Sequence, residues 1–365
     1  MYVCASCQRR YPAEAVVWRC ECGGHLEWQP EQPPSWNRAD IDSGDASLWR
    51  YAAALPVAKS ERRAFLGEGW TPLLTAPEQG LLLKLDFLCP TGSFKDRGST
   101  VLMNRLAALG VREALEDSSG NAGASIAAYG AAAGIGCEVY VPASASGAKL
   151  AQIAAYGARV VAVPGSRQDV TEAALRRSAE LFYASHNWHP LFLEGTRTLG
   201  FELWEQLGFR SPDAVVTPVG AGSTLLGCWR AFRELAAAEP GTLVPRLYAA
   251  QAAACAPLVA ALAQGQEQPR GVEPGPTVAE GIKIGDPIRG RELLRALRRS
   301  GGGARAVTEA EITAAQERLG RQGIFVEPTG AVAYAAALGL LARGEIRPAE
   351  RVAVVLTGSG LKAAA

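Results

Sequence analysis

The residue with the clearest chemical capability is Lys95, within the segment PTGSFKDRG at 90–98. Pro90 and Gly92 predict a turn, and a helix is expected to begin near Arg97, so the lysine lies at the mouth of a strand–helix unit. Ligands of α/β folds bind at such places. A lysine amine forms Schiff bases with carbonyl compounds once its surroundings keep part of it neutral. On spacing alone, a solvated surface lysine is the commoner outcome.

Three other loops of small residues follow predicted strands. In DSSGNAG at 117–123, backbone N–H groups at a helix start suit an anion such as a carboxylate, although an ordinary N-capped turn would look the same. In PVGAGST at 218–224, a glycine loop before a helix can cradle a phosphate. Its spacing is not G-x-G-x-x-G and no acidic residue stands where a ribose would need one, which argues against a dinucleotide site. In VVLTGSG at 354–360, a buried strand ends in a hydroxyl and two glycines, which could be a simple turn.

Four of the eight cysteines lie in the first 22 residues, at Cys4, Cys7, Cys20 and Cys22. Two close pairs separated by a hairpin-length stretch are typical of four thiolates around a structural Zn²⁺ ion. His25 could replace one ligand. A disulfide is disfavoured in a cytoplasmic chain, and thiols without a metal are the remaining alternative. The other four cysteines have apolar neighbours and are predicted to be buried.

From Leu81 onward, the chain alternates short apolar runs with helix-length stretches rich in Ala, Leu and Arg, which predicts parallel βα units. The predicted strands are 81–85, 137–141, 159–163, 214–218, 246–250 and 351–356. The predicted helices begin after Gly98, Asn121, Gly147, Gln168, Thr196, Ser223, Thr308 and Thr329. The stretches 271–276 and 301–303 are predicted loops.

Length and charge limit the function further. A chain of 365 residues suggests two to three domains. A net charge of +1 gives no electrostatic footprint for nucleic acid or an acidic membrane surface. The longest apolar stretches are too short to span a bilayer, and the N-terminus lacks the pattern of a signal peptide. We therefore expect a cytoplasmic protein that acts on a small molecule, without a nucleic-acid or membrane partner.

Taken together and in this order, the segments closely resemble the threonine synthase family, which belongs to the tryptophan-synthase-β class (fold type II) of pyridoxal-phosphate (PLP) enzymes. The resemblance covers nearly the whole chain after residue 60. The matching runs are GEGWTPL at 67–73, PTGSFKDRG at 90–98, SSGNAGAS at 118–125, LEGTRT at 193–198, PVGAGS at 218–223, IFVEPTGA at 324–331 and LTGSGLK at 356–362.

The resemblance implies an α/β fold of two domains with twisted, mostly parallel sheets, and a homodimer. It implies a large PLP-binding domain at 31–98 and 195–365 and a small mobile α/β domain at 99–194. Residues 1–30 form a further zinc-ribbon-like module, and some relatives carry a similar cysteine ribbon.

The resemblance also implies roles for single residues. Lys95 carries PLP as a Schiff base and is the general base at Cα. Asn121 contacts the cofactor's 3′ oxygen, and Thr357 contacts the pyridine nitrogen. A neutral hydroxyl next to the pyridine nitrogen favours expulsion of a leaving group over transamination. The cofactor's phosphate is bound by Gly220, Ala221, Gly222, Ser223 and Thr224. The carboxylate of the amino-acid substrate is bound, with Asn121, by Ser118, Ser119, Gly120 and Ala122.

The chain departs from the family where the family binds the phosphate of its substrate. Ala122 replaces a threonine, and Phe192 stands in the place of an arginine. Losing an arginine from a dianion site removes charge-assisted bonds worth about 1.5–3 kcal/mol each. His186 and His189 could partly replace it if protonated, or could be neutral core histidines.

Three functions therefore stay open. The first is a threonine-synthase-type lyase that converts O-phosphohomoserine and water to threonine and phosphate. The second is a β-eliminating or β-replacing enzyme acting on serine, threonine or another amino acid. The third is a catalytically silent relative that binds an amino acid or a partner, which the presence of Lys95 disfavours.

Overall fold

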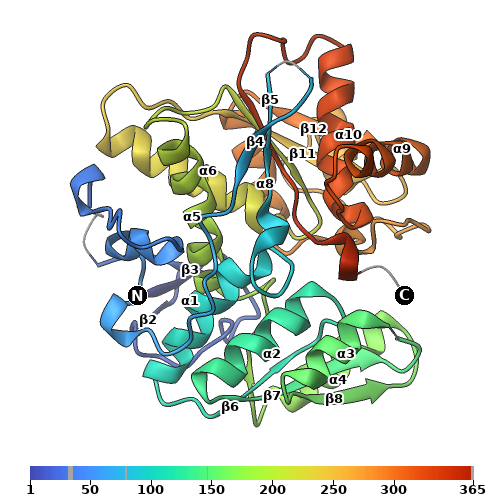
Figure 1. The fold of residues 1–365 in the computed structure, drawn as a ribbon. Helices are drawn as coiled ribbons and strands as arrows, with labels where there is room; N and C mark the ends of the chain where they lie inside the picture. Colours follow the sequence, from blue (N-terminus) through green and yellow to red (C-terminus); the bar gives the residue numbers. More distant parts are fainter. Residues whose placement is uncertain (32–35, 79, 146, 363–365) are drawn as a thin grey trace. The chain divides into compact units, whose positions relative to one another are not determined.

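The computed structural model describes residues 1–31, 36–78, 80–145 and 147–362, and the chain divides into two compact units (Figure 1). The first unit contains residues 1–69 and 89–196, and the second contains residues 70–88 and 197–362. The boundary at 196/197 falls within helix α5 (Pro190–Gln206). Within the described residues, no helix is both long enough and apolar enough to cross a membrane.

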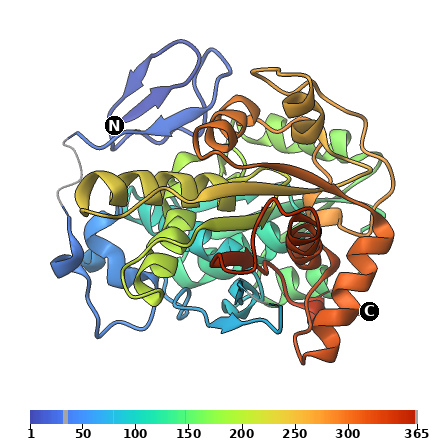
Figure 2. The same ribbon diagram turned by 90° about the horizontal axis from the view of Figure 1, so that it is seen from above.

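The first unit has a four-stranded parallel sheet in the order β8-β7-β6-β9 and a three-stranded antiparallel sheet in the order β2-β1-β3 (Figures 1 and 2). The parallel strands are β6 (Glu113–Glu116), β7 (Gly136–Pro142), β8 (Arg159–Val163) and β9 (Phe182–Tyr183). The antiparallel strands are β1 (Tyr2–Cys4), β2 (Arg10–Tyr11) and β3 (Leu26–Trp28). The α-helices are α1 (Lys95–Ala108), α2 (Asn121–Ala133), α3 (Ala148–Ala155) and α4 (Arg167–Arg177), and the short 3₁₀ helices are η1 (Arg38–Asp40), η2 (Leu48–Ala54) and η3 (Lys59–Glu61).

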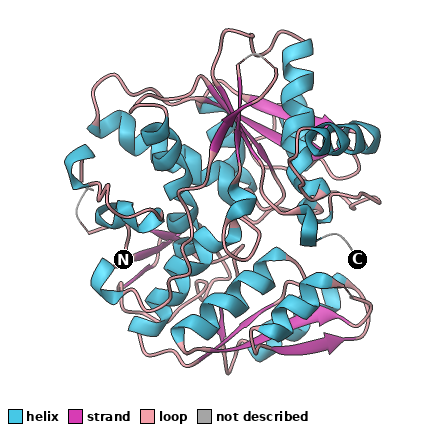
Figure 3. Ribbon diagram, in the orientation of Figure 1, coloured by secondary structure: helices cyan, strands magenta, loops and turns pink. Residues whose placement is uncertain are grey.

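The second unit is built on a six-stranded sheet in the order β12-β11-β10-β13-β5-β4, in which only the β4–β5 pairing is antiparallel (Figure 3). Its strands are β4 (Leu73–Thr75), β5 (Leu81–Lys84), β10 (Ala214–Pro218), β11 (Arg246–Ala252), β12 (Gly303–Val307) and β13 (Val352–Val355). Its helices are α6 (Ser223–Ala238), α7 (Pro257–Ala263), α8 (Gly290–Arg299), α9 (Glu309–Arg321) and α10 (Pro328–Ala342), with the short 3₁₀ helices η4 (Asp86–Leu88), η5 (Glu280–Ile282) and η6 (Gly360–Lys362). Strand β13 is buried along its whole length, as expected for a parallel strand covered on both faces.

The predicted α/β class with mostly parallel sheets is confirmed, but several boundaries differ. Helix α5 begins at Pro190 and not after Thr196, because proline is compatible with the first turn of a helix. Helix α1 begins at Lys95, two residues before Arg97, near which it was predicted to begin. Strand β12 begins at Gly303, inside the predicted loop, and helices α7 and α8 were not predicted.

The contact boundaries also differ from the domain limits expected from the resemblance. Trp49, Val57 and Ala64 share one buried core with Val101 and Leu102 of α1. This shared core explains why residues 36–69 and α1 fall in the same unit. The functional domains at 31–98 with 195–365, and at 99–194, stay a prediction, and residues 363–365 lie outside the described part.

A buried ion pair joins strand β5 to helix α5 inside the second unit. The Lys84 ammonium lies 2.5 Å from Oε1 of Glu202, and both side chains are fully buried. Lys84 also donates to the carbonyl of Thr71 at 2.5 Å and to Oε1 of Gln206 at 2.8 Å. These acceptors together satisfy a charge that would otherwise be costly to bury.

We expect Lys84→Met to lower the free energy of unfolding by about 3–5 kcal/mol, because it leaves the Glu202 carboxylate buried without its cation. Lys59→Met is the control, since Lys59 pairs at 2.7 Å with Asp42 but is 38% exposed, and exposed pairs contribute about 0–1 kcal/mol. Urea denaturation measures both. Equal losses in the two variants would contradict the importance of the buried pair.

Candidate active site

The loop that carries Lys95 is held by the carboxylate of the next residue. Asp96 is fully buried and accepts hydrogen bonds from the backbone N–H of Thr91 at 2.7 Å and from its hydroxyl at 2.6 Å. It also accepts from the hydroxyl of Ser125, on helix α2, at 2.6 Å. Asp96 thereby ties the turn before Lys95 to a second helix. The Lys95 amine lies 4.8 Å from the ring centre of Phe94 and 5.7 Å from that of Phe192.

The predicted carboxylate loop leads directly from strand β6 into helix α2. Asn121 is the first residue of that helix, and the backbone N–H of Gly120 bonds to Oγ of Ser118 at 3.2 Å. A Cβ on Gly123 would lie 1.9 Å from the carbonyl oxygen of Ser118, so this tight turn requires glycine. Residues 118–121 are partly exposed while Ala122 is buried, so the start of the helix is accessible to an anion.

The two predicted substrate-binding histidines have different surroundings. Nδ1 of His186 lies 2.7 Å from Oε1 of Glu116, a residue that sequence reasoning did not select. His189 is buried, with its ring 5.8 Å from that of Tyr2 and 5.6 Å from that of Phe182. These aromatic contacts are those of a core histidine, and the role of His189 in substrate binding stays a prediction.

In the second unit, the predicted phosphate loop and Thr357 lie at the same edge of the sheet. They follow β10 and β13, which are adjacent and parallel. Gly222 has φ +82° and begins the 16-residue helix α6. Within the described residues, the buried Oγ1 of Thr357 has no hydrogen-bond partner.

These features fit a phosphorylated heterocycle such as PLP. A glycine loop at the start of a long helix presents N–H groups to a phosphate. The buried hydroxyl of Thr357 needs a partner, which a ring nitrogen would supply. Lys95 and Asn121 belong to the first unit, and the residues 220–224 and Thr357 belong to the second.

The four N-terminal cysteines come together as the sequence predicted. Their sulfur atoms all lie within 4.8 Å of one another, and Sγ of Cys4 is 3.5 Å from that of Cys22. The same distance separates Cys7 and Cys20. Backbone N–H groups of Ser6 and Cys7 point to Sγ of Cys4, at 3.4 and 3.5 Å.

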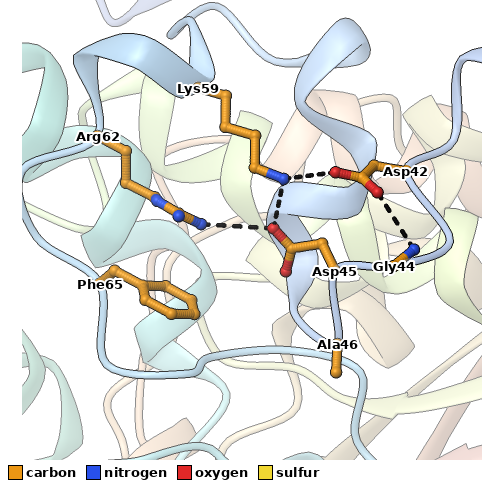
Figure 4. A pocket seen from close by; sticks show the side chains of 7 residues that line it. All are labelled: Asp42, Gly44, Asp45, Ala46, Lys59, Arg62 and Phe65. Atoms are coloured by element: carbon orange, nitrogen blue, oxygen red, sulfur yellow. Dashed lines mark hydrogen bonds and ion pairs between the residues drawn. The ribbon is translucent and has the colours of Figure 1, made fainter.

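A surface hollow of about 450 Å³ lies elsewhere in the first unit (Figure 4). Its charges are already paired: Lys59 contacts Asp42 and Asp45 at 2.7 Å, and Arg62 contacts Asp45 at 3.4 Å. Phe65 lies under the guanidinium of Arg62 at 4.2 Å. The hollow contains none of the predicted site residues, and its mutually paired charges give no reason to assign it a ligand.

Comparison with known proteins identifies the family of the chain. Residues 64–358 match the family model described as "Pyridoxal-phosphate dependent enzyme". The chain belongs to this family. It is 36% identical to threonine synthase from Methanocaldococcus jannaschii, with 98% of this chain and 92% of the relative covered, and 35% identical to threonine synthase from Methanosarcina acetivorans, with 98% and 91% covered.

Solved structures of threonine deaminases share the fold. The crystal structure of a threonine deaminase from T.th. is 31% identical with a TM-score of 0.66, and the match covers 79% of this chain and 92% of that one. The processed form of threonine deaminase isoform 2 from Solanum lycopersicum has a TM-score of 0.73 at 21% identity, covering 91% and 90%. The predicted fold type II and the resemblance to threonine synthase are confirmed.

Asp96→Asn should lower the free energy of unfolding by about 2–3 kcal/mol, because an amide cannot accept from all three buried donors. The exposed Asp169, which caps helix α4, provides the control, and Asp169→Asn should cost about 1 kcal/mol or less. Thermal or urea unfolding measures both. If the two substitutions had the same small effect, Asp96 would not organise the lysine loop.

Proposed function

We propose that the protein is a PLP-dependent carbon–oxygen lyase in which Lys95 binds the cofactor and takes the Cα proton of an amino acid. The observation that carries this proposal is the link between Lys95 and the carboxylate loop. Asp96, next to Lys95, bonds at 2.6 Å to Ser125, one turn after Asn121. The amine and the predicted carboxylate-binding turn are therefore fixed to the same pair of helices.

Each group of the chain has a defined task in this proposal. The bound cofactor supplies a conjugated ring that withdraws the electrons left on Cα when the proton leaves. Backbone N–H groups at residues 119–122 hold the substrate carboxylate at the start of α2. The start of α6 holds the cofactor phosphate. The hydroxyl of Thr357 meets the ring nitrogen without adding a negative charge, which favours elimination over transamination.

Two reactions fit this class. The likeness to curated threonine synthases over nearly the whole chain supports conversion of O-phosphohomoserine and water to threonine and phosphate. The buried Phe192, in the place of a phosphate-binding arginine, supports β-elimination or β-replacement on serine, threonine or another amino acid. Phosphate release from O-phosphohomoserine and 2-oxobutyrate release from threonine distinguish the two.

The protein should bind PLP covalently, and borohydride reduction followed by peptide mapping should place the label on Lys95. Lys95→Ala should abolish the label and lower kcat by about 10²–10⁴-fold, the usual contribution of a general base. Lys149→Ala, on the nearby helix α3, controls for loss of any lysine. A label on another lysine, or a colourless protein in excess cofactor, would refute the proposal.

We further propose that Cys4, Cys7, Cys20 and Cys22 bind one structural Zn²⁺ ion. Support comes from their mutual distances, since four sulfurs about 2.3 Å from one tetrahedral ion lie about 3.8 Å apart. The sulfur pairs at 3.5 Å are close to this value. Four thiolates complete the coordination, so the ion would stabilise the module without acting on substrate.

The purified protein should therefore contain one zinc per chain by elemental analysis. Cys22→Ser should lower the zinc content and the melting temperature of the module, because the site loses one of its four ligands. Cys228→Ser, a buried cysteine of helix α6, is the control and should keep the metal. Unchanged zinc in the Cys22 variant, or none in the wild type, would contradict the proposal.

A further inference from the structure

Glu116 and His186 form a buried acid–imidazole pair beside the predicted carboxylate loop. Glu116 is the last residue of β6, and His186 follows the adjacent parallel strand β9. Both residues therefore lie at the carboxyl edge of the same sheet, where the loop to Asn121 also begins. The Glu116 side chain is fully buried and that of His186 is 9% exposed.

Burial disfavours the charged form of both members of the pair. Burial, followed by the charge of Asp117, raises the pKa of Glu116 well above its ordinary value. Burial also lowers the pKa of His186 well below its ordinary value, and the positive charges of Lys95 and Arg167 add to this effect. A single proton shared between carboxyl and imidazole satisfies both tendencies.

The surroundings of the pair offer hydrogen-bond acceptors. Oε2 of Glu116 and Oδ1 of Asn187 are buried and have no hydrogen-bond partner in the part of the chain that the structure describes. The nearby guanidinium of Arg167 is held by Asp117 at 2.8 Å. An acceptor without a partner is best satisfied by a ligand that donates a proton.

Phe192 connects the pair to the lysine. The ring of His186 lies 5.8 Å from that of Phe192, and the Lys95 amine lies 5.7 Å from the same ring centre. All of these residues belong to the first unit. The pair is thus one aromatic ring away from the amine that we propose to act at Cα.

We propose that Glu116 and His186 form the side-chain subsite of the lyase and select an uncharged hydroxyl over a phosphate ester. This inference rests on the proposed function. A hydroxyl can donate to the open acceptors, whereas a phosphate carries about −1.5 to −2 charges and only acceptor oxygens.

Calorimetric titration and steady-state kinetics on the cofactor-loaded enzyme test the proposal with two matched pairs of probes. These are serine with O-phosphoserine and homoserine with O-phosphohomoserine. The wild type should bind the hydroxyl member of each pair at least about tenfold more tightly, as expected from one lost charge-assisted hydrogen bond. Tighter binding of either phosphorylated member would overturn the proposal.

Glu116→Gln replaces an acceptor oxygen by a donor amide. The ratio of the affinity for the hydroxyl member to that for the phosphorylated member of each pair should then shift about tenfold toward the phosphorylated member. The change should appear in KM more than in kcat. Glu113→Gln, at the exposed other end of β6, is the control and should leave the ratio unchanged. His186→Asn should shift the ratio in the same direction if Glu116→Gln does not fold. An unchanged ratio in a folded variant overturns the subsite.

Failure of the proposed function has a different signature. If borohydride does not label Lys95 and neither member of a pair binds, then the lyase proposal fails and the subsite with it. If Lys95 is labelled and both members bind equally, only the subsite fails.

Discussion

The buried carboxylate of Asp96 is the group on which the candidate site in the first unit depends. It accepts from Thr91 before Lys95 and from Ser125 within helix α2. A charge without donors would be costly at full burial, so the loop and the helix are held together as long as the carboxylate stays satisfied. The position of the Lys95 loop relative to the turn at Asn121 is therefore set by the residue next to the lysine.

A second constraint is the close approach of helices α1 and α5. A Cβ on Gly195 would lie 1.9 Å from the carbonyl oxygen of Arg97, and a Cβ on Gly98 would lie 2.5 Å from the ring of Phe192. Gly195 lets the backbone of α5 touch that of α1, and Gly98 lets the ring of Phe192 pack directly on α1. Phe192 is fully buried. The aromatic ring that lies near both Lys95 and His186 is thus fixed by packing in the core.

Local patterns were sufficient for much of the fold and for part of the site. Strands 159–163 and 214–218 were predicted to the residue because short apolar runs bounded by turn residues have few other interpretations. The clustering of the four cysteines also followed from spacing. Glu116 could not be found in this way, because its partner His186 is 70 residues away and only the pairing of β6 with β9 brings them together. The one sequence feature that could have pointed to Glu116 was a carboxylate at the end of a buried strand.

The departures from the threonine synthase pattern fit one altered subsite better than separate losses. Loss of the arginine alone would leave unfilled space and unbalanced charge at the position where the family binds the substrate phosphate. Here the position holds Phe192, whose ring packs closely against Gly98, and the carboxyl of Glu116 has an imidazole partner at 2.7 Å. Arg167, one of the two cations whose charges act on His186, is paired with Asp117. The space at Phe192 is therefore filled and the buried carboxyl of Glu116 has a hydrogen-bond partner, as close packing and the cost of buried charge require.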